Sequence, residues 1–126
     1  LGIGGLDDIL HGVSSGYDTF DCVSPTRIAR HGIMMSKLSS KGINLNNSKF
    51  KDDHSSIDEG CELQEINKFS KSYIHHLFKA NEMLGMTILS IYNIWFMNKF
   101  FEDIRVNIER DTFEKFKKDF FDNLTK

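Results

Sequence analysis

Several features that mark particular protein classes are scarce in this sequence of 126 residues. Its two cysteines are too few for a disulfide framework, which favours a reducing compartment. The longest purely apolar run, Ile94–Met97, is far too short to span a bilayer. The chain does not open with the basic and apolar segments of a secretory signal. We therefore expect a cytoplasmic protein without a membrane partner.

Charge is nearly balanced, with a formal net charge of −2, so composition alone does not predict a nucleic-acid binder. The charges are nevertheless segregated, because residues 22–51 contain no Asp or Glu and residues 52–65 contain no Lys or Arg. Charged runs are mostly solvated, but arginine forks suit phosphates and base edges. A phosphate-binding face and a solvated segment both stay open for the basic residues Arg27, Arg30, Lys37, Lys41, Lys49 and Lys51.

The first part of the chain has the pattern of a parallel α/β unit. Residues 1–5 are typical of a strand end and a tight loop, and a helix from Asp7 or Asp8 to about Ser14 should stop at Gly16. Residues 17–23 alternate as a strand would, and the only proline, Pro25, should end the unit. One such unit cannot close a parallel sheet, which suggests that an N-terminal part of the fold is missing.

The remainder should begin with a hairpin and continue as helices. Residues 33–35 and 43–45 predict two strands around a turn at 39–42, and residues 52–60 predict a polar loop. Apolar residues at steps of three and four predict helices over 63–77, 88–110 and 113–124, with a break at Gly85. The inner face of the long helix is expected along Ile91, Ile94, Trp95, Asn98 and Phe101.

Single residues suggest few sites by themselves. Asp21 follows an expected strand, at the end where catalytic side chains gather in parallel barrels, so it is a candidate nucleophile at a sugar carbon. The alternative, a carboxylate that caps the next turn, is favoured by spacing alone. His75 and His76 are adjacent in an expected helix and do not share a face, which argues against a common metal. Residues 2–5 lack the spacing of a phosphate-binding loop.

Longer motifs are more specific. The run DTFDCVSPTRIARHG, residues 18–32, resembles the signature of tRNA-guanine transglycosylases, also called queuine tRNA-ribosyltransferases. The resemblance continues in order over essentially the whole chain, and it matches only the C-terminal third of the family's proteins. It is carried further by Gly2-Ile3-Gly4 with Asp7-Asp8-Ile9, residues 46–53 and 70–77, Glu82-Met83-Leu84-Gly85, Asn93, and Phe113 with Phe116.

This resemblance implies an α/β fold class: the C-terminal part of a (β/α)8 TIM barrel with a hairpin and a mostly helical subdomain. Residues 1–51 would be the end of the barrel and the hairpin. Residues 52–126 would be the helical subdomain, which in the family binds zinc.

The resemblance also implies an activity, the exchange of guanine at the tRNA wobble position for a 7-deazaguanine base in queuosine biosynthesis. Asp21 matches the nucleophile that attacks the ribose C1′. The partners would be the tRNA anticodon loop and either an N-terminal barrel half or a second copy of the chain. The RNA-binding residues would be Gly2, Ile3, Gly4, Gly5, Leu6, Asp7, Asp8, Thr26, Arg27, Ile28, Ala29 and Arg30.

The sequence departs from the family in length. A complete barrel needs roughly 250 residues, and the strands that carry the family's second catalytic Asp and guanine pocket are not in this sequence. We expect the fragment alone to be inactive. A non-catalytic tRNA-binding accessory subunit and an inactive remnant are the alternatives.

A second departure concerns zinc. The family motif is Cys-x-Cys-x-x-Cys followed by a histidine. Of these positions only Cys61 is kept, while Leu63, Ile66 and Tyr92 occupy the others. One ligand cannot hold a structural zinc, which needs four nitrogen or sulfur donors. We expect no metal and no other cofactor. The substitutions indicate either a small apolar cluster in place of zinc or the decay of a gene fragment.

Overall fold

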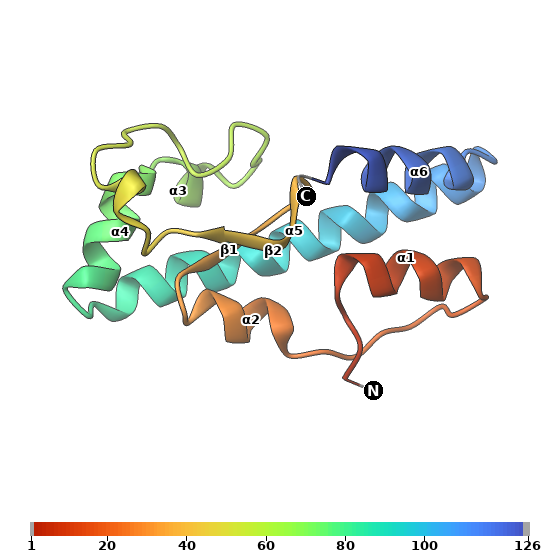
Figure 1. Ribbon diagram of the computed structural model, residues 1–126, viewed down its shortest axis with the longest axis horizontal. Coiled ribbons are helices and arrows are strands. Elements are labelled where there is room, and N and C mark those ends of the chain that lie inside the picture. The colour runs from red at the N-terminus through yellow and green to blue at the C-terminus, as the bar shows by residue number, and fades with distance from the viewer. Residues whose placement is uncertain (1, 125–126) are drawn as a thin grey trace.

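The structure is a computed structural model that describes residues 2–124; Leu1, at the expected strand end, lies outside the described residues. The molecule is organised along one long helix, α5 (Met83–Glu109). Figure 1 shows α1 and α2 along one side of α5 and α3 and α6 along the other. Buried side chains of the described residues form one hydrophobic cluster to which nearly every element contributes.

The inner face of α5 differs from the expected one. Ile91 and Ile94 are 44% and 47% exposed, and Asn98 is exposed as well. The buried stripe still follows helical spacing, but it is rotated around the helix axis relative to the prediction. Its members are Gly85, Ile88, Leu89, Tyr92, Asn93, Phe96, Phe100 and Ile104.

The N-terminal part contains two short helices, α1 (Leu6–Ser14) and α2 (Ser24–Ala29). The helix ending at Ser14 is confirmed, but the strand expected over 17–23 is wrong, because no strand within residues 2–124 pairs with this segment. Pro25 lies in the first turn of α2, where a missing N–H costs nothing, and does not end the unit. Thus the alternating pattern of 17–23 describes an extended connection and not a strand.

The expected hairpin is confirmed, with a different turn. Strands β1 (Ile33–Ser36) and β2 (Ser39–Asn44) pair antiparallel through a turn at residues 37–38, not at 39–42. Gly42 lies inside β2 with φ of +71°, and a Cβ there would stand 2.6 Å from the Met34 carbonyl oxygen. The glycine therefore serves an irregularity of the ladder, between Met34 and Ser36, and not the turn.

This hairpin is the only sheet within residues 2–124, so the chain has mixed content and is mostly helical. No parallel strand pair of a barrel is present among the described residues. The barrel part of the expected fold therefore stays a prediction. The same residues contain no helix that combines the length and the apolarity needed to cross a lipid bilayer.

The second half departs from the prediction at two breaks. After a 3₁₀ turn, η1 (Ser48–Phe50), and the confirmed loop, the helix expected over 63–77 is two helices, α3 (Gln64–Asn67) and α4 (Lys71–Lys79). Ser70 separates them, because its hydroxyl accepts the Tyr73 N–H at 3.1 Å and caps α4.

The break expected at Gly85 is also misplaced, because Gly85 lies in the first turn of α5, packed closely against Leu77 and Phe78. The chain turns instead at Asn81, whose φ is 56°. The last helix, α6 (Phe113–Asn123), is confirmed. It packs on α5 through rings, with Phe100 5.6 Å from Phe120 between centroids.

Candidate nucleic-acid interface

Two of the segments expected to contact RNA lie side by side. The Gly2 N–H donates to the Asp21 carbonyl oxygen at 2.7 Å. At Gly4 the approach is closer still, since a Cβ there would stand 2.4 Å from the Cys22 Cβ. Only glycine allows this contact. The structure thus brings the 2–5 loop next to Asp21, although they are far apart in the sequence.

Asp21 is exposed and lines a small cavity of about 390 Å³. Asp8 and His11 line the same cavity from α1, and so does Phe20, whose ring lies close to Gly12. The sequence analysis did not select His11. Its spacing from Asp8, three residues along a helix, places both on one face and could have indicated the pair. Two carboxylates and an imidazole therefore share one concave surface.

The residues expected to bind RNA divide into exposed and buried ones. Arg27 and Arg30 are exposed, and neither takes part in an ion pair within the described residues. Ala29 is fully buried, and Leu6 in α1 is only 4% exposed, so both belong to the core. Thr26 and Ile28 are half-buried, and Gly4 is buried against Cys22. An RNA would therefore meet mainly the exposed members, while the buried ones hold the segments in place.

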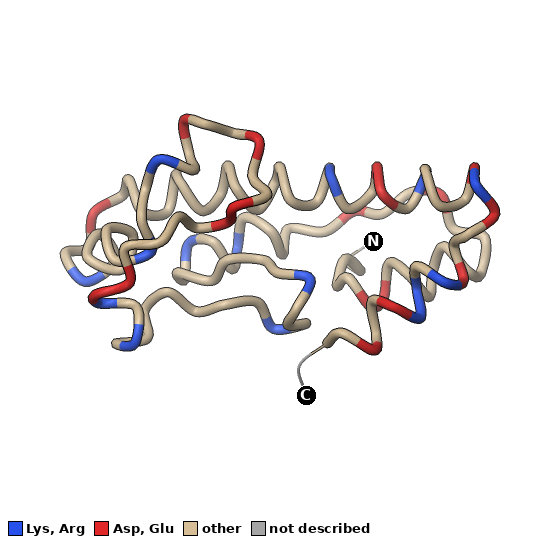
Figure 2. The backbone as a smooth tube through the Cα atoms, turned by 90° about the horizontal axis from the view of Figure 1, so that it is seen from above, with Lys and Arg blue, Asp and Glu red and all other residues tan. Residues whose placement is uncertain are grey.

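The start of α2 is fixed locally by a thiol. The Cys22 Sγ donates to the Ser24 hydroxyl at 3.0 Å and accepts the Ser24 N–H at 3.3 Å. Figure 2 shows that the chain continuing from here through the hairpin carries basic positions without acidic ones. Unpaired guanidinium groups on such a surface attract phosphates over the range of a Debye length.

The four positions of the expected zinc motif lie in the core. Cys61 is 7% exposed, Ile66 6% and Tyr92 1%, and Leu63 packs against the same cluster. The Tyr92 hydroxyl donates to the Asp58 carboxylate at 2.8 Å, and that carboxylate also accepts the Gly60 N–H at 2.9 Å. An aromatic ring and a hydrogen-bonded carboxylate thus fasten the loop before α3 to α5.

Zinc does not fit this arrangement. Burial, with the nearby Asp58 and Glu62 charges, raises the pKa of the Cys61 thiol, whereas a zinc ligand must be a thiolate. Burial and the Asp58 contact likewise raise the pKa of Tyr92, so its hydroxyl keeps its proton. Across residues 2–124 no cluster of three or more His, Cys, Asp or Glu side chains is placed to hold a metal ion.

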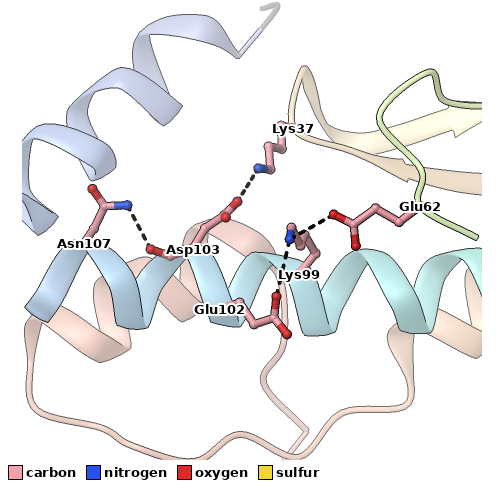
Figure 3. Close-up of polar contacts among 6 residues, drawn as sticks. All are labelled: Lys37, Glu62, Lys99, Glu102, Asp103 and Asn107. Atoms are coloured by element: carbon pink, nitrogen blue, oxygen red, sulfur yellow. Dashed lines mark hydrogen bonds and ion pairs between the residues drawn. The ribbon is translucent and has the colours of Figure 1, made fainter.

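A larger cavity, of about 690 Å³, lies between the hairpin, the loop at 57–60 and α5. Two lysines that line it, Lys37 and Lys99, are engaged in ion pairs, as Figure 3 shows. Lys37 of the hairpin meets Asp103 at 2.6 Å, and Lys99 meets Glu62 at 3.3 Å. The hydrogen bond and charge of Glu62 raise the pKa of Lys99. These contacts join the hairpin and the loop to α5, so this cavity is a weaker ligand candidate than the Asp21 surface.

A family model described as "Queuine tRNA-ribosyltransferase" matches residues 1–126 of this sequence. The chain belongs to the queuine tRNA-ribosyltransferase family. Curated relatives of that name are 47% identical in Clostridium tetani over 94% of this chain and 48% identical in Clostridium acetobutylicum over 93%. A third, from Dictyoglomus turgidum, is 41% identical over 95%. The family resemblance of the sequence motifs is thereby confirmed.

The chain spans only part of these relatives. The match covers 31% of the length of the two clostridial proteins and 30% of the Dictyoglomus protein, in their C-terminal part. The activity of a complete family member is therefore a proposal for this chain.

Proposed function

We propose that this chain carries the nucleophile and the anticodon-recognising segments of a tRNA-guanine transglycosylase. Residues 1–51 would hold these segments at the end of a barrel, and residues 52–126 would form the supporting helical subdomain. The observation that carries the proposal is the placement of an exposed Asp21 beside the 2–5 loop and shortly before α2, where Arg27 and the C-cap residue Arg30 are both exposed. The two free cysteines agree with a cytoplasmic location.

In the proposed reaction an Asp21 carboxylate oxygen bonds to the ribose C1′ of the wobble nucleotide while the C1′–N9 bond to guanine breaks. Guanine leaves with that electron pair and takes up a proton from solvent. The incoming 7-deazaguanine base then bonds through N9 to C1′ and loses a proton, as the ester to Asp21 breaks. The covalent step keeps the sugar from water between the two bases, so exchange replaces hydrolysis.

The arginines would position the RNA. Arg27 in α2 and Arg30 at the C-cap of α2 are three residues apart, so both guanidinium groups can meet one stretch of backbone or base edges. Asp21 precedes this helix, so an anticodon loop bound to it would lie near the carboxylate. The remaining catalytic parts would come from an N-terminal barrel half, and we expect the fragment alone to be inactive.

The test uses an anticodon stem-loop RNA with guanine at the wobble position. The chain is combined with the N-terminal part of the Clostridium tetani relative, and we measure incorporation of labelled guanine and a covalent RNA adduct on denaturing gels. Asp21→Asn should abolish both. Asp18→Asn, an exposed aspartate nearby, is the matched control and should leave both unchanged.

The outcome separates the alternatives. Stem-loop binding without adduct or exchange would replace the enzymatic proposal by an accessory tRNA-binding role, for which the unpaired arginines are the specific support. Absence of binding as well would contradict both roles.

A further inference from the structure

Asn93 is the one fully buried amide side chain in the inner stripe of α5, with 0% exposure. Its Oδ1 accepts the Met35 N–H at 2.9 Å. Its Nδ2 donates to the Pro25 carbonyl at 2.9 Å and to the Ile33 carbonyl at 3.1 Å. These hydrogen bonds all go to backbone atoms, and they join three elements: α5, β1 and the first turn of α2. The sequence analysis placed Asn93 only as part of a motif.

The strand needs these bonds. The ladder between β1 and β2 is irregular between Met34 and Ser36, so the intervening residue, Met35, is outside the regular pairing. β1 also has no second neighbour among the described strands. An unpaired buried N–H or C=O is costly, and the Asn93 amide meets one of each on this edge. The Asn93 side chain thus supplies hydrogen bonds to β1 that a neighbouring strand would otherwise supply.

The helix α2 depends on the same amide. It has six residues and no side-chain cap at Val23, and a helix this short is not stable by its own propensity. The Cys22 thiol holds its first residue locally, and the buried Ala29 and the bond from Asn93 to Pro25 attach the helix to the rest of the fold. The position of the exposed Arg27 and Arg30 therefore depends on how α2 is attached to α5.

We infer that Asn93 is a positioning residue for RNA recognition: by bonding the Pro25 carbonyl and the edge of β1, it orients α2 and the arginines on it. The inference rests on the proposed function, because it gives these arginines an RNA to meet. Asn93 itself is buried and touches no RNA. It acts through the backbone of α2, so its loss should disturb discrimination between RNAs and not only the amount of folded protein.

The test compares Asn93→Asp with Asn98→Asp, the same change at an exposed position of the same helix. Aspartate keeps the acceptor for the Met35 N–H but loses both donors, and it sets a charge against two carbonyls. We measure affinity for the anticodon stem-loop RNA and for the same RNA with the two nucleotides that flank the wobble position replaced, because the guanine pocket is not in this chain. Asn93→Asp should reduce the preference for the unmodified stem-loop at least about fivefold, the value of a good polar base contact. Asn98→Asp should leave the preference unchanged.

Two further readouts separate positioning from instability. Partial unfolding lowers both affinities by one factor, so their ratio would not move. Lowering the pH from about 7.5 to about 5.5 should restore the preference, because a carboxyl group whose pKa is raised by burial takes up a proton and regains one donor. If Asn93→Asp does not fold, Asn93→Ser replaces it, with amide hydrogen exchange of residues 26–30 measured in both folded chains.

An unchanged preference in folded Asn93→Asp or Asn93→Ser would overturn the positioning role and leave the proposed function standing. A parent chain that binds neither stem-loop would overturn the proposed function and this inference with it. Loss of preference in the Asn93 variant, with the Asn98 control intact, supports both.

Discussion

Tyr92 and Asn93 are neighbours in α5, both buried, and they hold two different parts of the chain. Asn93 bonds only backbone atoms, in β1 and at the start of α2. Tyr92 bonds one side chain, Asp58, and otherwise makes ring contacts with Trp95 and Phe96. An amide with fixed donors and acceptor determines direction, whereas a ring mainly fills volume.

The regions around Asn93 and Tyr92 should therefore tolerate different kinds of substitution. Around Asn93, small changes in polarity should alter the orientation of a segment that we assign to RNA recognition. Around Tyr92, the positions matching a metal motif now hold apolar side chains, and the region should tolerate changes that conserve volume. The following predictions test this contrast, from the largest expected effect to the smallest.

The largest change would be a restored metal site. Replacing Leu63→Cys, Ile66→Cys and Tyr92→His together, beside Cys61, should create four donors and bind one zinc per chain, with apparent binding free energy of about 10–16 kcal/mol. The parent should bind none. Elemental analysis after dialysis measures the zinc content of the variant and the parent. Thermal unfolding with and without chelator measures how much the metal stabilises each.

The control is the same variant with Cys61→Ser, which should lose the zinc. A folded triple variant that takes up no zinc would show that the four positions do not converge. Stoichiometric zinc in the parent would contradict the metal-free interpretation directly.

Removing the aromatic ring of Tyr92 should destabilise the chain strongly. Tyr92→Ala empties a site that is 1% exposed, and we expect a loss of about 3–5 kcal/mol in the free energy of unfolding. Tyr17→Ala, at a tyrosine that is 64% exposed, should change it by no more than about 0.5 kcal/mol. Urea denaturation measures both. Equal effects at the two positions would disprove the role of Tyr92 in the core.

The smallest effect concerns alkaline pH. The pKa of Tyr92 is raised in the folded chain, so its contribution to stability is complete below the unfolded value of about 10 and is lost as the pH rises above it. Tyr92→Phe should lower stability by about 1 kcal/mol at neutral pH. It should also make the alkaline decline shallower.

The measurement is urea denaturation at a series of pH values, with Tyr73→Phe, a partly exposed tyrosine, as the control. An identical alkaline decline in the parent and Tyr92→Phe would contradict a raised pKa of Tyr92 in the folded chain.

Local patterns predicted the elements whose signals are local. The helix up to Ser14, the hairpin and the helix after Phe113 were recovered, because periodicity and turn residues act over a few positions. The predictions failed where contacts with another segment determine the secondary structure. The segment 17–23 alternates as a strand does, but it has no neighbouring strand in the part of the chain that the structure describes. Ser70 interrupts a continuous apolar stripe by capping α4.

For the candidate site, motif order was enough to recognise the family and to nominate Asp21 and the arginines. Which of the nominated residues are exposed, and that Gly2 and Gly4 lie against residues 21–22, depended on contacts between distant segments. The same holds for Asn93: a polar residue in an apolar stripe indicates buried hydrogen bonds, but only folding assigns its partners. Hydrogen bonds to backbone carry no sequence signature at the acceptor, because every residue supplies the same carbonyl.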